Sequence, residues 1–171
     1  KRVFIKTVIA TVAMAAMGIV SAQEKTIKFA NQNAVGHPVV QGMEKFKEIV
    51  EKNSGGKLKV NVFPGGALGS DQANVSAIQG GTIEMASMNS GIFASQVKDF
   101  AVFDFPFMFA SGKEADVVVD GAFGKKMHAK LEEKGIVGLG YYELGFRHMT
   151  NGKRAINKVS DIEGLKLRVI P

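Results

Sequence analysis

The feature that most constrains the fold is a change of hydrophobic period in the first third of the chain. Residues 26–30 alternate between apolar and polar side chains, with Ile27 and Phe29 on one face, as in a β-strand. A helical spacing follows, shown by these apolar residues: Val39, Val40, Met43, Phe46, Ile49 and Val50. Residues 58–62 then alternate again. The order strand, helix, strand predicts an α/β fold built on an open sheet.

Local signals mark the ends of these elements. His37-Pro38 begins the first helix, because proline fits a first turn in which its missing N–H costs nothing, and Gly55-Gly56 ends it. Ser70 is a suitable N-cap for a second helix, which we expect to run to about Gln79. A third strand is expected to start at Ile83, and three polar residues follow its end: Ser87, Asn89 and Ser90. Open α/β sheets bind ligands at the carboxyl ends of their strands, so these side chains are candidate ligand contacts.

The second half of the chain is expected to add further elements. Residues 113–119 and 123–134 have helical patterns, residues 136–142 are apolar enough for a strand crossing between two lobes, and residues 165–170 resemble another strand. Residues 100–109 contain five of the 12 phenylalanines. We interpret this segment as core and hinge packing, with the lining of a ligand cleft as the alternative.

Residues 1–22 have the pattern of a secretory signal peptide. A basic start at Lys1, Arg2 and Lys6 precedes an apolar stretch, and small residues precede an expected cut between Ala22 and Gln23. A membrane anchor is the alternative, disfavoured because the apolar stretch is short and no basic cluster follows it. Removing three basic residues lowers the formal charge from +6 to +3, which argues against a nucleic-acid binder. We therefore expect a periplasmic protein.

Two arginines near the end of the sequence differ from the other basic residues in their surroundings. Arg147 follows an apolar run, and Arg168 lies between Leu167 and Val169 in the expected strand. A guanidinium in apolar surroundings needs an anionic partner, and its planar fork matches a carboxylate. The pattern favours a carboxylate-binding site. Pairing of Arg168 with a carboxylate of the protein itself, or an exposed edge strand, would explain the same pattern.

Patterns typical of enzymes are absent from the sequence. The chain has no cysteine, no G-x-S-x-G motif, and no pair among its three histidines spaced for one helix face. Neither Gly138-Leu139-Gly140 nor the glycines of residues 65–69 complete a nucleotide-binding motif. We expect no enzymatic activity, no metal and no cofactor.

Five segments, in this order and spacing, resemble the substrate-binding subunit of tripartite ATP-independent periplasmic (TRAP) transporters, dicarboxylate type. They are Gly66-Ala67-Leu68-Gly69, QGGTIEM at 79–85, FPFMF at 105–109, Gly145-Phe146-Arg147 and DIEGLKLRV at 161–169. The resemblance implies a periplasmic-binding-protein fold with two hinged lobes, of which this chain would be the amino-terminal part. Residues 23–143 would then form the first lobe, and residues 144–171 the start of the second.

The resemblance also implies a function and a set of contacts. Such proteins capture an organic acid in the interlobe cleft and deliver it to a membrane permease driven by an ion gradient. Ligand contacts are implied at these residues: Arg168, which would clamp the carboxylate, Arg147, Asn89, Gln32 and His37. A binding protein of an ATP-driven importer or a sensory system is the alternative, and a secreted hydrolase is a more distant one.

Overall fold

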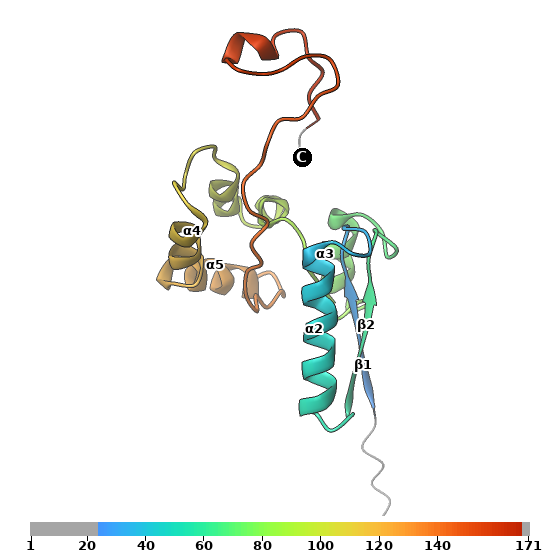
Figure 1. Cartoon of the computed structure of the whole chain (residues 1–171). Coiled ribbons are helices and arrows are strands. Elements are labelled where there is room, and N and C mark those ends of the chain that lie inside the picture. Colours follow the sequence, from blue (N-terminus) through green and yellow to red (C-terminus); the bar gives the residue numbers. More distant parts are fainter. Residues whose placement is uncertain (1–23, 169–171) are drawn as a thin grey trace, which may run out of the picture.

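The computed structural model describes residues 24–168 and contains a three-stranded parallel sheet in the order β2-β1-β3 (Figure 1). The strands are β1 (Lys25–Ala30), β2 (Leu58–Phe63) and β3 (Met85–Ala86). In the register, Ile27 lies opposite Val60, and Phe29 lies opposite both Val62 and Met85. The predicted strand–helix–strand unit is therefore confirmed, with β1 in the centre of the sheet.

Helix α2 (Pro38–Asn53) covers one face of this sheet (Figure 1). The alternation predicted from the sequence places Ile27 and Phe29 on the covered face, where Phe29 is buried and packs edge-on against Phe46 with ring centroids 5.6 Å apart. The buried residues of this first core are Phe29, Val39, Val40, Met43 and Val60. The opposite face carries Lys28 and Asn61, which are exposed.

A second core follows β2. Helix α3 (Asp71–Gln79) begins at Ser70, whose hydroxyl accepts a hydrogen bond from the Ala73 N–H at 3.3 Å, as predicted for an N-cap. The chain continues through 3₁₀ helices η1 (Ser90–Ser95) and η2 (Lys98–Asp104) to helices α4 (Gly112–Val119) and α5 (Ala122–Glu132). The core that they form buries Val75, Ile92, Phe100, Met127, Leu131 and Ile136.

Two predicted strands are wrong over the residues that the structure describes. Residues 136–142 and 165–168 have no regular secondary structure, and only the short helix η3 (Val159–Ile162) lies between them. A strand exists only where a neighbouring strand takes up its backbone N–H and C=O groups, and these segments have no such neighbour within residues 24–168. Residues 169 and 170 of the second predicted strand, and the predicted signal peptide at 1–22, lie outside the described residues.

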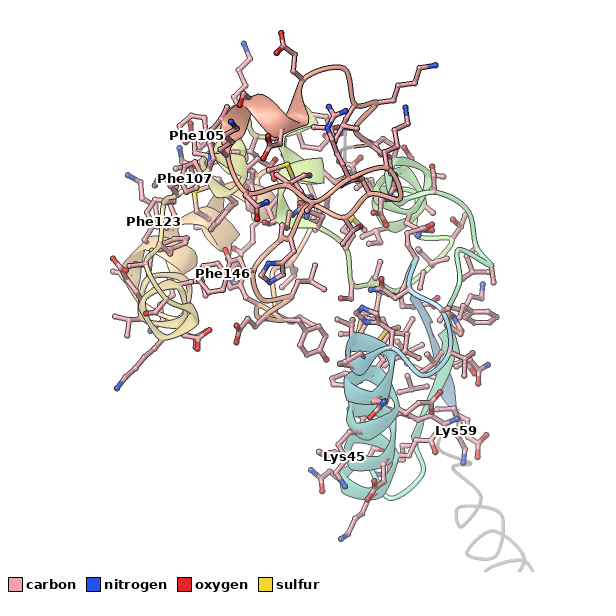
Figure 2. The ribbon with its side chains drawn as sticks, turned by 45° about the horizontal axis from the view of Figure 1, so that its top comes forward. Lys45, Lys59, Phe105, Phe107, Phe123 and Phe146 are labelled. Atoms are coloured by element: carbon pink, nitrogen blue, oxygen red, sulfur yellow. The ribbon has the colours of Figure 1, made fainter. Side chains whose placement is uncertain are left out.

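The aromatic segment, residues 100–109, contains both buried and exposed phenylalanines. Phe100 is buried in the second core and packs against Phe93 and Phe103, with ring centroids 5.5 and 5.6 Å apart. Phe105 and Phe107 are exposed, on the same side of the molecule as Phe123 (Figure 2). Core packing was therefore predicted correctly for the start of the segment and wrongly for its end. No helix of residues 24–168 is both long and apolar enough to span a membrane.

Candidate functional site

The carboxyl ends of the three strands are tied together by one buried residue, Asn31, which follows β1 and is 3% exposed. Its backbone N–H donates to the carbonyl of Phe63, at the end of β2, at 3.0 Å. Its side-chain amide nitrogen donates to the carbonyl of Ser87, just after β3, at 2.7 Å, and its side-chain oxygen accepts from the Asn33 N–H at 2.7 Å. Sequence reasoning missed Asn31, although an asparagine directly after a buried strand is a usable signal.

The strand order creates a topological switch point at the carboxyl end of the sheet. The chain passes from central β1 to β2 on one side, and then from β2 to β3 on the other side of β1. The loops that follow β1 and β3 therefore separate, and open α/β sheets bind ligands at such a switch point. The loop after β1 carries Gln32 and His37, and the residues after β3 include Asn89. The fold thus places three of the five predicted contacts on the two loops beside this switch point.

Gln32 is exposed and oriented by the turn after β2. Its side-chain nitrogen donates to the Gly69 carbonyl at 2.5 Å. The side chain also lies close to Gly66, where a Cβ atom would be only 2.8 Å from the Gln32 Oε1 atom. A glycine at position 66, with its φ of 72°, therefore suits both the turn and the approach of Gln32.

His37 is the N-cap of α2. Its Nδ1 atom accepts a hydrogen bond from the Val39 N–H at 3.2 Å, so in the neutral ring the hydrogen is on Nε2, which can donate to a ligand. The first turn of α2 contains no acidic residue. The partial positive charge of this helix end is therefore not offset locally and favours an anion.

Asn89 is half-buried and begins η1. Its side-chain oxygen accepts from the Gly91 N–H at 2.9 Å. Within residues 24–168 its amide nitrogen has no hydrogen-bond partner, so that group remains a donor for a ligand. Gln32 is thus fixed through its nitrogen and keeps an acceptor, whereas Asn89 is fixed through its oxygen and keeps a donor.

Arg147 and Arg168 are both exposed. Neither guanidinium forms a hydrogen bond or an ion pair with the described part of the chain. The segment that carries them leaves the helical part and lies away from the sheet (orange to red in Figure 1). No hydrogen bond within residues 24–168 joins the two arginines to Gln32, His37 or Asn89, and contact of these residues with one ligand stays a prediction.

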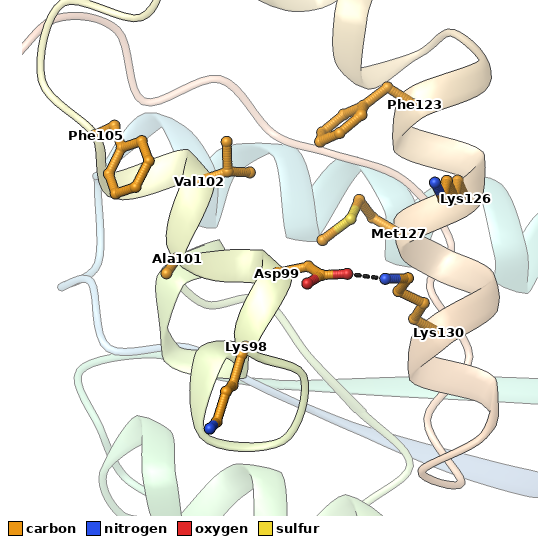
Figure 3. Close-up of a pocket in the computed structure, with 9 residues that line it drawn as sticks. All are labelled: Lys98, Asp99, Ala101, Val102, Phe105, Phe123, Lys126, Met127 and Lys130. Atoms are coloured by element: carbon orange, nitrogen blue, oxygen red, sulfur yellow. Dashed lines mark ion pairs between the residues drawn. The ribbon is translucent and has the colours of Figure 1, made fainter.

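A separate hollow of about 340 Å³ lies between η2 and α5 (Figure 3). It is lined by the apolar residues Val102, Phe105, Phe123 and Met127. Asp99 and Lys130, which also line it, form an ion pair. None of the five predicted contacts lines this hollow. We place the candidate site at the carboxyl end of the sheet because the loops with Gln32, His37 and Asn89 lie beside a topological switch point there.

Three titratable groups within residues 24–168 have shifted pKa values, and the first is Asp71 at the start of α3, whose pKa is raised by burial. Burial lowers the pKa of His128, partly offset by Glu132, and burial raises the pKa of Tyr141. The two rings stack with centroids 4.7 Å apart, and the Tyr141 hydroxyl donates to the Gly124 carbonyl at 3.3 Å. This pair belongs to the packing around α5. Residues 24–168 contain no group of three acidic, histidine or cysteine side chains placed to hold a metal ion.

Comparison with known proteins identifies the family. The profile of the bacterial extracellular solute-binding proteins, family 7, matches residues 29–171. The chain belongs to this family. It is 34% identical over 149 residues to the C4-dicarboxylate-binding periplasmic protein of Rhodobacter capsulatus, covering 86% of this chain and 44% of that protein. The resemblance found in the sequence is confirmed.

Solved structures of the family confirm the fold class. A TRAP periplasmic solute-binding protein from Ochrobactrum anthropi is 50% identical with a TM-score of 0.79, covering 88% of this chain and 47% of that one. The sugar acid binding protein of Advenella mimigardefordensis, in complex with galactonate, is 41% identical with a TM-score of 0.84, covering 87% and 48%. The chain thus spans about half the length of the family 7 proteins that it matches.

Proposed function

We propose that this chain supplies one side of the cleft of an extracytoplasmic solute-binding protein of the TRAP type. The protein captures an organic acid and delivers it to a membrane permease, and its site binds without catalysis. The observation that carries the proposal is the strand order β2-β1-β3, because it places the loops with Gln32, His37 and Asn89 beside one topological switch point. The names of the relatives support a periplasmic location.

The ligand class follows from the groups that have no partner within residues 24–168. The arginine forks of Arg147 and Arg168 match carboxylate oxygens, and the amides of Gln32 and Asn89 match hydroxyl or carbonyl groups. Related proteins have been solved with galactonate, D-glucuronate, D-erythronate and succinate, which share a carboxylate. We infer a small hydroxy acid or diacid as the ligand. The two lobes close because the ligand gains its second set of contacts only in the closed state.

Replacing Arg168 with lysine in the full-length protein tests this function. Calorimetric titration with galactonate, D-glucuronate, D-erythronate and succinate is expected to show at least one binder, and Arg168→Lys should weaken it at least tenfold. Lysine keeps the charge but loses the fork, and one charge-assisted hydrogen bond contributes about 1.5–3 kcal/mol.

Lys166→Arg is the matched control, because it exchanges the same residue types two positions earlier, at an exposed side chain. It should leave the affinity unchanged. Equal affinity of Arg168→Lys and the wild type would show that Arg168 does not bind the ligand carboxylate through its fork. If the wild type bound none of the four acids, the proposed ligand class would be refuted.

A further inference from the structure

Arg154 differs from Arg147 and Arg168 because its guanidinium already donates hydrogen bonds within the protein. Arg154 Nε donates to the Asp161 carbonyl at 2.9 Å, and an Arg154 terminal nitrogen makes a short hydrogen bond to the Glu163 carbonyl. The guanidinium therefore joins two backbone carbonyls that lie seven and nine residues further along the chain. Such a two-carbonyl contact suits the planar, divergent donors of arginine.

The backbone at Arg154 is itself held by Asn151. The Asn151 side-chain oxygen accepts from the N–H groups of Lys153 and Arg154, at 2.9 and 3.0 Å. Its side-chain nitrogen donates to the Arg154 carbonyl at 2.8 Å. Asn151 thus closes a tight turn from which the Arg154 side chain extends.

The helix that Arg154 contacts is capped at its other end. The Asp161 carboxylate accepts from the N–H groups of Asn157 and Lys158, at 2.9 and 3.1 Å, just before η3. The positive charge of Arg154 lies at the carboxyl end of η3, where exposed carbonyls favour a cation. We call residues 151–164, with these hydrogen bonds, the polar bracket.

The polar bracket leads directly to Arg168. Gly164 has a φ of 75°, and the Leu165 N–H donates to the Ile162 carbonyl at 3.0 Å, so the chain turns where the bracket ends. Arg168 lies four residues after Gly164. The direction in which the chain reaches Arg168 is therefore set by the turn that Arg154 holds through the Glu163 carbonyl.

Apolar packing does not hold the polar bracket in its conformation. Within the described part of the chain, no buried residue of either core comes after Ile136. All residues of the polar bracket are exposed or half-buried. Its conformation rests on the hydrogen bonds of Asn151, Arg154 and Asp161.

We propose that Arg154 is a positioning residue for ligand binding: it fixes the turn before Arg168 so that the Arg168 guanidinium meets the ligand carboxylate in one orientation. This inference rests on the proposed function of Arg168. We expect Arg154 to act through Arg168, because its Nε and one terminal nitrogen are already engaged by the protein.

The test uses Arg154→Lys in the full-length protein, with the four acids named above as probes. Lysine carries its donors on one nitrogen instead of a planar fork, so we expect it to hold the two carbonyls less well and the turn to be correctly formed in a smaller share of molecules. If that share falls to about a tenth, the Kd rises about tenfold. The melting temperature without ligand should stay unchanged, because both cores are intact, whereas amide exchange at Leu165 should accelerate. Lys153→Gln, an exposed neighbour, is the control and should change neither the Kd nor the exchange rate.

The double variant of Arg154→Lys and Arg168→Lys separates the two proposals. If Arg154 acts through Arg168, the double variant binds no more weakly than Arg168→Lys alone. Loss of affinity in Arg168→Lys with wild-type affinity in Arg154→Lys would overturn the positioning role and leave the proposed function standing. An equal extra loss in both backgrounds would also overturn it, since Arg154 would then act independently. No effect of Arg168→Lys would remove the proposed clamp itself.

Discussion

Replacing Asn31 with leucine should destabilise the protein although the two side chains have similar size. Asn31 is buried, and its side chain satisfies the Ser87 carbonyl and the Asn33 N–H at 2.7 Å each. Leucine leaves both backbone groups without their partner. A buried polar group that loses its partner costs about 1–3 kcal/mol.

The net cost is smaller than the sum of two such terms. Ser87 and Asn33 are half-buried, so water reaches part of each orphaned group, and leucine gains some apolar burial. We expect the free energy of unfolding to fall by about 2–3 kcal/mol. With a urea m-value of about 2 kcal/mol/M, the unfolding midpoint should fall by about 1–1.5 M.

Urea unfolding followed by far-UV circular dichroism measures this shift. Asn61→Leu is the matched control, because Asn61 lies on β2 and is exposed, and its midpoint should change little. Asn31→Asp separates the two bonds: it keeps the acceptor for Asn33 but places an oxygen against the Ser87 carbonyl. Equal midpoints for Asn31→Leu and Asn61→Leu would show that Asn31 does not tie the strand ends together.

Two further predictions concern the cores. Met43 is 0% exposed in the first core, so Met43→Ala should lower the free energy of unfolding by about 2–5 kcal/mol, whereas Met149→Ala, at a residue that is 56% exposed, should leave the urea midpoint nearly unchanged; equal shifts would contradict the assigned core. Burial lowers the pKa of His128 from its ordinary 6.5, so the unfolded chain binds more protons than the folded chain as the pH falls. The contribution of this group to stability is therefore complete above pH 6.5 and is lost as the pH falls through the lowered folded pKa. His128→Gln should therefore flatten the fall in urea midpoint between pH 7 and 5, and His148→Gln, at an exposed histidine, should not; an unchanged slope for His128→Gln would refute the role of burial.

The start of β3 illustrates a limit of sequence reasoning. The alternation suggested a strand from Ile83, but β3 covers only Met85–Ala86. The Glu84 side chain accepts from the Lys28 N–H at 2.8 Å and so takes up a donor of β1 near the beginning of β3. A side-chain contact between residues 56 positions apart leaves no mark in the local pattern.

The two arginines illustrate another limit. The apolar neighbours of Arg168 suggested a strand, yet residues 165–168 form no strand. A strand depends on a partner segment rather than on its own composition alone. The flanking residues alone did not reveal that Arg154 is engaged by backbone carbonyls while Arg168 is exposed. The motifs around Arg147 and Arg168 nevertheless indicated the family, because that signal depends on residue identity and spacing alone.

The sequence by itself determined the order of the first three strands and two helices, the start of α2 at His37-Pro38, the cap at Ser70 and the family. These depend on interactions within a few residues, or on a pattern read directly from the chain. Only the tertiary structure decided that β1 lies between β2 and β3, that Asn31 joins their ends, and which segments find a strand partner. Those outcomes depend on hydrogen bonds between distant residues, which form only after the chain has folded.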